Sequence, residues 1–151
     1  MQKIDHAAAL YHRLLLLVAP VGAGKTSTLR AVCDRTGAPR INANLELSLR
    51  MLGLTERQRV LQLPRLLGEI VSAARGEVVL LDNIELLFAV AYKQDPLRLL
   101  QGLSRSKTLV AAWSGCVDDG HLIYAAPGHP EYRRYPLDGL LMASPEPTAF
   151  R

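Results

Sequence analysis

Ala19-Pro20-Val21-Gly22-Ala23-Gly24-Lys25-Thr26 is the stretch that decides the fold of this chain of 151 residues. It follows the apolar run 14–18 and leads into a helical pattern, which predicts a strand, a tight turn and a helix in succession. Glycines let the turn curl until successive backbone N–H groups converge, and the start of the helix adds partial positive charge. The stretch therefore predicts a P-loop that binds a polyphosphate, with Ala19 standing where the usual pattern has its first glycine.

The same pattern predicts roles for individual side chains. Lys25 is expected to reach the β- and γ-phosphates of ATP, and the hydroxyl of Thr26 is expected to bind Mg²⁺. No guanine-specific Asn/Thr-Lys-x-Asp stretch occurs, and its absence leaves the choice between ATP and GTP open. The residues expected to contact the nucleotide are Pro20, Val21, Gly22, Ala23, Gly24, Lys25, Thr26 and Ser27.

A second apolar run, 78–81, ends in Asp82. In sheets that carry a P-loop, the carboxylate at the end of such a Walker B strand lies beside the loop and orders the Mg²⁺ shell. An aspartate in this position can instead cap the helix that follows, but the P-loop upstream favours the metal role. Thr26 and Asp82 are therefore the predicted metal ligands.

The residues after Asp82 bear on hydrolysis. Many ATPases of the AAA+ type have a glutamate directly after the Walker B aspartate, where it polarises the attacking water. This chain has Asn83 there, and an amide can bind a water but cannot take its proton. Glu85 could serve if the chain turns sharply after Asp82, or it could be a solvated glutamate of a first helical turn. Hydrolysis is therefore expected to be slow or to depend on a partner.

The apolar run 108–113 predicts a strand between the P-loop strand and the Walker B strand, and Ser114 follows it. In AAA+-type sheets a polar residue at this strand end contacts the γ-phosphate or the water, but a serine that starts a turn fits the sequence equally. Arg98 and Arg105 precede this strand. Each is a candidate arginine finger for a neighbouring subunit, but for each the sequence favours an ordinary solvated surface arginine.

Strands and helical segments alternate along the chain, which predicts an α/β fold with a doubly wound, mostly parallel five-stranded sheet. Pro64 is expected in the first turn of its helix, where a missing N–H costs little. We expect one domain over 1–144, no helical lid domain after Ser114 and a flexible tail over 145–151. Helices are expected, besides the one after the P-loop, over 4–13, 47–52, 63–74 and 97–103. Strands are expected, besides those already named, over 40–45 and, as short edge strands, over 122–125 and 133–137.

The composition suits a protein of the reducing cytoplasm. Cys33 and Cys116 lie far apart without metal-ligand spacing, and Cys33 is most simply a small buried hydrophobe. The first residues lack the features of a signal peptide, and the run 14–18 is too short to cross a membrane. The net charge of +4 comes from scattered basic residues, which suits work near nucleic acid without indicating direct binding.

Several stretches together resemble one family, BrxF, the small P-loop protein of type 3 BREX phage-defence systems in bacteria. The likeness runs over nearly the whole chain, and the stretches 82–85 (Asp-Asn-Ile-Glu) and 127–130 (Pro-Gly-His-Pro) distinguish it from other P-loop proteins. The resemblance implies a cytoplasmic ATPase that works with other BREX defence proteins on DNA. The stretches that carry it are 20–26, 41–48, 80–88, 95–97 and 127–133.

Two functions stay open at this point. One is an ATPase; the other is a nucleotide-gated adaptor or assembly factor with little or no hydrolysis, which Asn83 favours. A kinase is disfavoured, because no segment supplies an acceptor pocket with an arginine-bearing lid. Without a lid domain the base side of the site should be open. We therefore expect partner-dependent assembly, either as a homo-oligomer or with other defence proteins.

Overall fold

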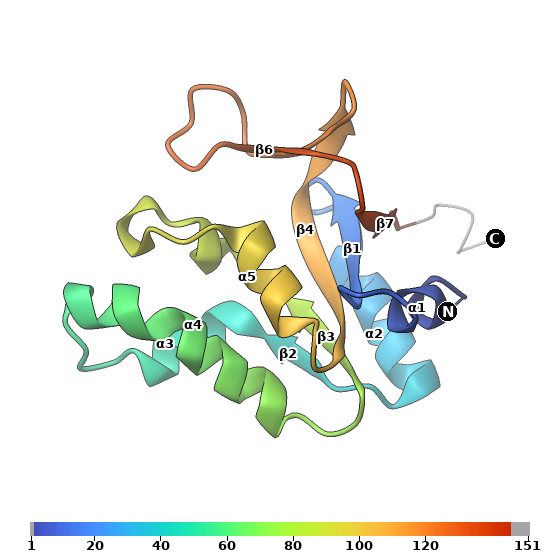
Figure 1. The fold of residues 1–151 in the computed structure, drawn as a ribbon, viewed down its shortest axis with the longest axis horizontal. Coiled ribbons are helices and arrows are strands. Elements are labelled where there is room, and N and C mark those ends of the chain that lie inside the picture. Colours follow the sequence, from blue (N-terminus) through green and yellow to red (C-terminus); the bar gives the residue numbers. More distant parts are fainter. Residues whose placement is uncertain (1, 146–151) are drawn as a thin grey trace.

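The computed structural model describes residues 2–145 and shows a parallel sheet with helices on both faces (Figure 1). Five strands run in the order β2-β3-β4-β1-β7, and every neighbouring pair is parallel. Both the P-loop strand β1 and the Walker B strand β3 pair with β4, as the sequence predicts. These strands are β1 (Leu14–Ala19), β2 (Arg40–Asn42), β3 (Val78–Asp82), β4 (Thr108–Asp118) and β7 (Leu141–Ala143).

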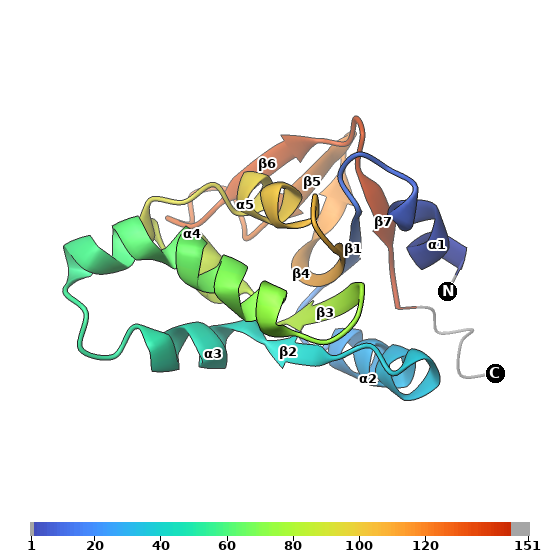
Figure 2. The same cartoon turned by 60° about the horizontal axis from the view of Figure 1, so that its bottom comes forward.

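Two helical layers bury the two faces of the sheet (Figures 1 and 2). On β1, Leu14, Leu16 and Val18 belong to the core under α3, α4 and α5, whereas Leu15 and Leu17 belong to the core under α1 and α2. An apolar run without alternation is typical of a parallel strand that is covered on both sides. The helices are α1 (Gln2–Ala8), α2 (Lys25–Thr36), α3 (Ala43–Arg50), α4 (Glu56–Ala73) and α5 (Pro96–Leu103), with two short 3₁₀ helices, η1 (Glu85–Phe88) and η2 (Val90–Tyr92).

Strand β4 is longer than the predicted run 108–113 and leaves the parallel sheet at its end. Its last residues pair in antiparallel fashion with β5 (His121–Tyr124), and β5 pairs with β6 (Arg133–Pro136). The two predicted edge strands are therefore present, as an extension of β4 rather than as edges of the parallel sheet. A Cβ atom at Gly115 would lie 1.9 Å from the carbonyl oxygen of Ile123, so β5 can pass this close only beside a glycine.

The expected strand over 40–45 is too long. Strand β2 ends at Asn42, whose side-chain oxygen accepts a hydrogen bond from the backbone N–H of Leu45 at 3.0 Å. This N-cap starts α3 at Ala43, four residues before the expected helix over 47–52. The expected helix over 4–13 is also too long, because α1 ends at Ala8 and Arg13 already pairs with the sheet.

Helix α4 begins much earlier than the expected helix over 63–74. Thr55 and Gln58 form a capping box that starts the helix at Glu56, so Pro64 lies in its interior and not in its first turn. A proline there leaves the carbonyl of Val60 without its usual donor, and the side-chain amide of Gln94 donates to that carbonyl at 3.1 Å. The helix is predicted from apolar residues at helical spacing, and five of the six are buried, whereas Ala74 is half-buried at the C-cap; the six are Leu63, Leu66, Leu67, Ile70, Val71 and Ala74.

Strand β7 was not predicted, and it adds the fifth parallel strand beside β1. Of the expected tail, Pro145 is described, and 146–151 lie outside the described residues. Cys33 is half-buried against the core under α2 rather than fully buried. None of the helices between residues 2 and 145 combines the length and the apolar character needed to cross a membrane.

Candidate phosphate-binding site

The P-loop joins the end of β1 to the start of α2. Gly22 and Gly24 have φ angles of +80° and +92°, a backbone region that favours glycine. Gly24 is the N-cap of α2 and offers no side chain to accept the N–H groups of the first turn. These donors, with the positive end of the helix dipole, suit a bound anion.

Lys25 is the first residue of α2 and is buried. Its Nζ atom donates to the carbonyl oxygens of Ala19 and Pro20, at 2.9 and 2.8 Å. Burial lowers the pKa of Lys25 from its usual value, although the nearby carboxylates of Glu85 and Asp82 act in the opposite direction. The ammonium group is thus folded back on the loop, where phosphate oxygens could replace the two carbonyls.

Thr26 and Asp82 meet at the centre of the site. The hydroxyl of Thr26 donates to Oδ2 of Asp82 at 2.7 Å, and the backbone N–H of Asn83 donates to Oδ1 at 2.9 Å. A hydroxyl and a carboxylate at this separation supply the hard oxygen donors that Mg²⁺ prefers. The donor set therefore fits a magnesium ion held by Thr26 and Asp82.

Asn83 shapes the turn after the Walker B strand. Its φ angle is +53°, a left-handed conformation that asparagine tolerates better than most residues. Its carbonyl oxygen accepts from the N–H of Asn44 at 2.9 Å, and the side-chain oxygen of Asn44 accepts from the N–H of Leu86 at 2.8 Å. The turn is therefore tied to the start of α3.

The sharp turn brings Glu85 into the site. Glu85 is the first residue of η1, and its Oε2 atom accepts from the hydroxyl of Ser114 at 3.3 Å. Ser114 is in register with Ala19, the last residue of β1. Because β4 continues to Asp118, Ser114 does not start a turn.

A cleft of about 520 Å³ opens between these groups. This volume lies within the range of typical ligand pockets. The cleft brings together all of the predicted catalytic residues and most of the residues predicted to contact the nucleotide. Its lining residues are Val21, Gly22, Gly24, Lys25, Thr26, Ser27, Asp82, Asn83, Glu85 and Ser114.

The two remaining predicted contacts, Pro20 and Ala23, line a second cleft of about 860 Å³ on the other side of the P-loop. Apolar side chains and backbone make up most of its described wall, with Lys3, Cys116 and Ser144 as the polar side chains. The far wall consists of the end of β4 and residues 142–145. The P-loop is therefore flanked by a polar cleft and a mainly apolar one.

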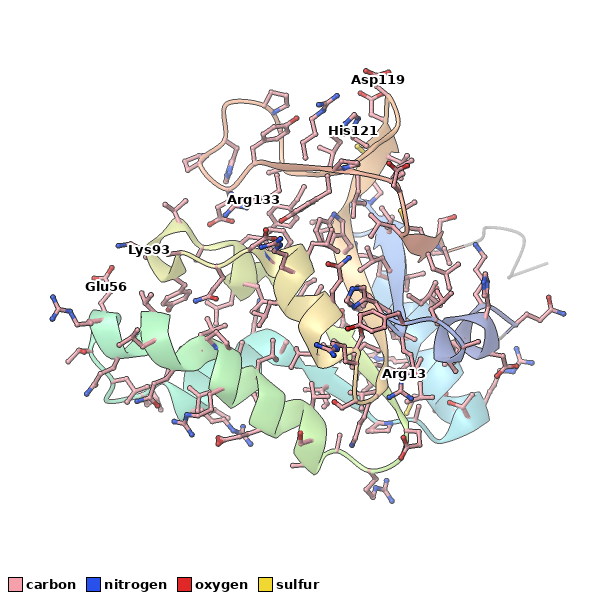
Figure 3. All side chains as sticks on the ribbon, in the orientation of Figure 1. Arg13, Glu56, Lys93, Asp119, His121 and Arg133 are labelled. Carbon is pink, nitrogen blue, oxygen red and sulfur yellow. The ribbon has the colours of Figure 1, made fainter. Side chains whose placement is uncertain are left out.

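Arg105 lies away from the site. It accepts a hydrogen bond through its carbonyl from Arg13, which Figure 3 labels at the opposite end of the sheet from the β4–β5 hairpin, and its guanidinium stacks on Tyr11. Arg98 is exposed in the first turn of α5 and does not line the phosphate cleft. His121 lies at the tip of the β4–β5 hairpin, beside Asp119 (Figure 3).

One residue of the site was missed by sequence reasoning. Arg40, at the start of β2, places its guanidinium 3.6 Å from Oδ2 of Asp82. Nothing in the local sequence marks this arginine, because the contact depends on the pairing of β2 with β3.

Comparison with known families agrees with this geometry. A model of the AAA family, described as ATPase family associated with various cellular activities, matches residues 15–111. The chain belongs to the AAA family. The AAA match contains the P-loop, Arg40, Asp82 and Glu85, whereas Ser114 and the hairpin of β5 and β6 follow it. A search among curated proteins gives no match.

Proposed function

We propose that the protein binds Mg-ATP in the phosphate cleft and hydrolyses it slowly or with the help of a partner. The observation that carries this proposal is the joint placement of Lys25, Thr26 and Asp82 around one cleft at the start of α2. Membership of a family of ATPases supports the same conclusion. Lys25 and the loop N–H groups would hold the phosphates, and Thr26 and Asp82 would hold the ion.

A bound Mg²⁺ neutralises charge on the phosphates, and the protein's own groups supply the remaining chemistry. Glu85 is the best candidate to orient the attacking water, since its carboxylate lines the cleft and can accept a proton. Ser114 would fix the position of that carboxylate through its hydroxyl. Asn83 lacks a proton-accepting group, and its backbone conformation already gives it a structural role.

The base and ribose would lie along the mainly apolar cleft on the other side of the loop. Pro20 and Ala23 line this second cleft, and they belong to the loop that also lines the phosphate cleft. The two clefts therefore share the P-loop as a wall. A wall of small apolar side chains suits stacking and shape more than hydrogen-bonded selection of a base. We therefore expect ATP and GTP to bind with similar affinity.

The alternative is an adaptor or assembly factor that uses bound nucleotide to fix its shape. We further propose that the protein acts in a BREX anti-phage defence complex, with the other BREX proteins as partners and an indirect relation to DNA. The resemblance of 82–85 and 127–130 to BrxF supports this context. The proposed setting is the cytoplasm.

Binding of a fluorescent ATP analogue and release of phosphate would test the proposal. Lys25→Ala should weaken nucleotide binding by about tenfold or more, because a charge-assisted contact to phosphate is lost. Lys93→Ala is a matched control, since Lys93 is exposed at the end of η2 and does not line the phosphate cleft (Figure 3). Glu85→Gln should bind nucleotide normally and lose phosphate release.

The assays should be run with and without DNA and the other BREX proteins. Phosphate release that survives both Lys25→Ala and Asp82→Ala would overturn the ATPase proposal. Tight nucleotide binding without phosphate release under every condition would favour the adaptor.

A further inference from the structure

The carboxylate of Asp82 forms an ion pair with the side chain of Arg40. The guanidinium of Arg40 lies 3.6 Å from Oδ2 of Asp82, the same oxygen that accepts the hydroxyl of Thr26 at 2.7 Å. The Arg40 side chain is 29% exposed, and the Asp82 side chain is only 5% exposed. The pair thus joins a buried carboxylate to a cation that keeps partial contact with solvent.

The sheet register places Arg40 on the metal-binding face. Arg40 is in register with Leu80, and residues opposite each other on paired strands share a face of the sheet. Leu80 packs in the core under α2, and Asp82 follows it by two residues on the same face. Ile41, the next residue of β2, packs on the other face. Arg40 therefore reaches along β3 to the carboxylate at its end.

The charges explain why such a partner is useful. A buried carboxylate without a counter-charge is strongly destabilising. The ammonium of Lys25, which lines the phosphate cleft, donates to the carbonyl oxygens of Ala19 and Pro20. Arg40 therefore supplies the ion pair to Asp82 before a nucleotide binds.

We propose that Arg40 is a positioning residue that competes with a free divalent cation for Asp82. Its positive charge lies beside the oxygen that the ion would use, so it opposes binding of the metal alone. The phosphates of a bound nucleotide bring enough negative charge to offset this repulsion. The divalent ion consequently enters with the nucleotide rather than before it. This inference rests on the proposed metal role of Thr26 and Asp82.

Titration with Mn²⁺ in the absence of nucleotide, with free and bound Mn²⁺ measured by electron paramagnetic resonance, tests the proposal. Arg40→Gln removes the charge and retains an amide, so Mn²⁺ should bind roughly tenfold more tightly than to the wild type. Arg40→Lys keeps the charge and should stay close to the wild type. Arg65→Gln is the matched control, because it removes an exposed arginine that pairs with Glu69 on α4.

Thermal unfolding provides a second readout that needs no nucleotide. In EDTA, Arg40→Gln should have a lower melting temperature than the wild type. When Mn²⁺ is added, the melting temperature of Arg40→Gln should rise by more than that of the wild type. Folding of Arg40→Gln only in the presence of Mn²⁺ would support the proposal as well. An unchanged or weaker Mn²⁺ affinity in Arg40→Gln would overturn it. Failure of all variants to bind Mn²⁺, or failure of Arg40→Gln to fold with Mn²⁺ present, would do the same.

Nucleotide binding in EDTA separates this inference from the proposed function. That measurement depends on Lys25 and the loop, and it does not require the metal ligands. Absence of nucleotide binding to the wild type both in EDTA and with Mg²⁺ present would remove the proposed function, whereas the Mn²⁺ titration would still measure the competition at Asp82.

Discussion

Asn83 stands where a catalytic glutamate is expected, and its backbone explains its presence. The φ angle of +53° at this position is costly for most residues with a Cβ atom, whereas asparagine tolerates it and glycine adopts it freely. We expect Asn83→Gly to fold with near wild-type stability and Asn83→Ala to lose about 1 kcal/mol of unfolding free energy. Urea unfolding of the three proteins would measure this, and an alanine variant as stable as the wild type would contradict it.

Tyr124 gives the protein a definite response to alkaline pH. Burial, with the charges of Glu85 and Glu131 nearby, raises the pKa of Tyr124 to about 12, against about 10 in an unfolded chain. Between these values the unfolded state has lost a proton that the folded state keeps. This contribution to stability is therefore complete below pH 10 and falls as the pH rises toward 12, by up to about 1.4 kcal/mol per pH unit.

Tyr124→Phe should accordingly show a flatter decline of unfolding free energy above pH 10 than the wild type. Denaturant unfolding at several pH values would measure the two slopes. Tyr11→Phe is the control, because it removes the same hydroxyl from a tyrosine whose side chain is 71% exposed. Equal slopes for Tyr124→Phe and the wild type would refute this assignment.

At the residue level, the site residues that could be predicted from the sequence are those that belong to a local motif. The strand, turn and helix around Lys25 and the end of the run 78–81 can be recognised within short windows. Glu85 was left undecided, because its position depends on the left-handed turn at Asn83. Arg40 was missed because an ion pair between two strands depends on their register, which no single window contains.

Helix α4 accommodates a proline in its interior through a side chain from another segment. Gln94 donates to the carbonyl of Val60, the group that the missing N–H of Pro64 would otherwise satisfy. We expect Gln94→Ala to cost about 1 kcal/mol in the wild type. The cost should be smaller in Pro64→Ala, where the restored N–H can bond to Val60.

A double-mutant cycle measures this coupling directly. Unfolding free energies of the wild type, the two single variants and the double variant give the interaction energy between positions 64 and 94. Additive effects would show that Gln94 does not replace the lost donor.

At the element level, the periodic and capped segments were predicted best. The apolar repeat of α4 and the helix expected over 97–103 are both present, the latter as α5 with Asp95 as its N-cap, since each is specified by neighbouring residues. Boundaries were wrong where a side chain starts a helix early, as Asn42 does for α3. Strand β7 was missed because only its pairing with β1 distinguishes its three residues from a loop.

At the scale of the whole molecule, the cleft proposed to bind the nucleotide lies at one end of the sheet (Figure 1). After β4, the residues described up to 145 form three strands and no helix, so no helical segment of this region covers the second cleft. An uncovered base side would leave the nucleotide in contact with solvent. Closure by another protein chain would strengthen nucleotide binding and could supply positive charge to the phosphates.

We therefore expect the protein to form larger assemblies with its cognate proteins when ATP and Mg²⁺ are present. Light scattering after size-exclusion chromatography would measure the mass with and without nucleotide. Lys25→Ala should fail to assemble under the same conditions. A monomer in every mixture would contradict this expectation.

Gly115 carries a consequence for related sequences. The carbonyl of Ile123 occupies the place where any side chain of residue 115 would begin, so a larger residue there forces the antiparallel extension away from the core. Relatives that retain this extension should keep glycine directly after the serine at which β4 leaves the parallel sheet. Relatives that lack this glycine should have a different structure in place of the antiparallel extension. One residue therefore separates relatives with the extension from those without it.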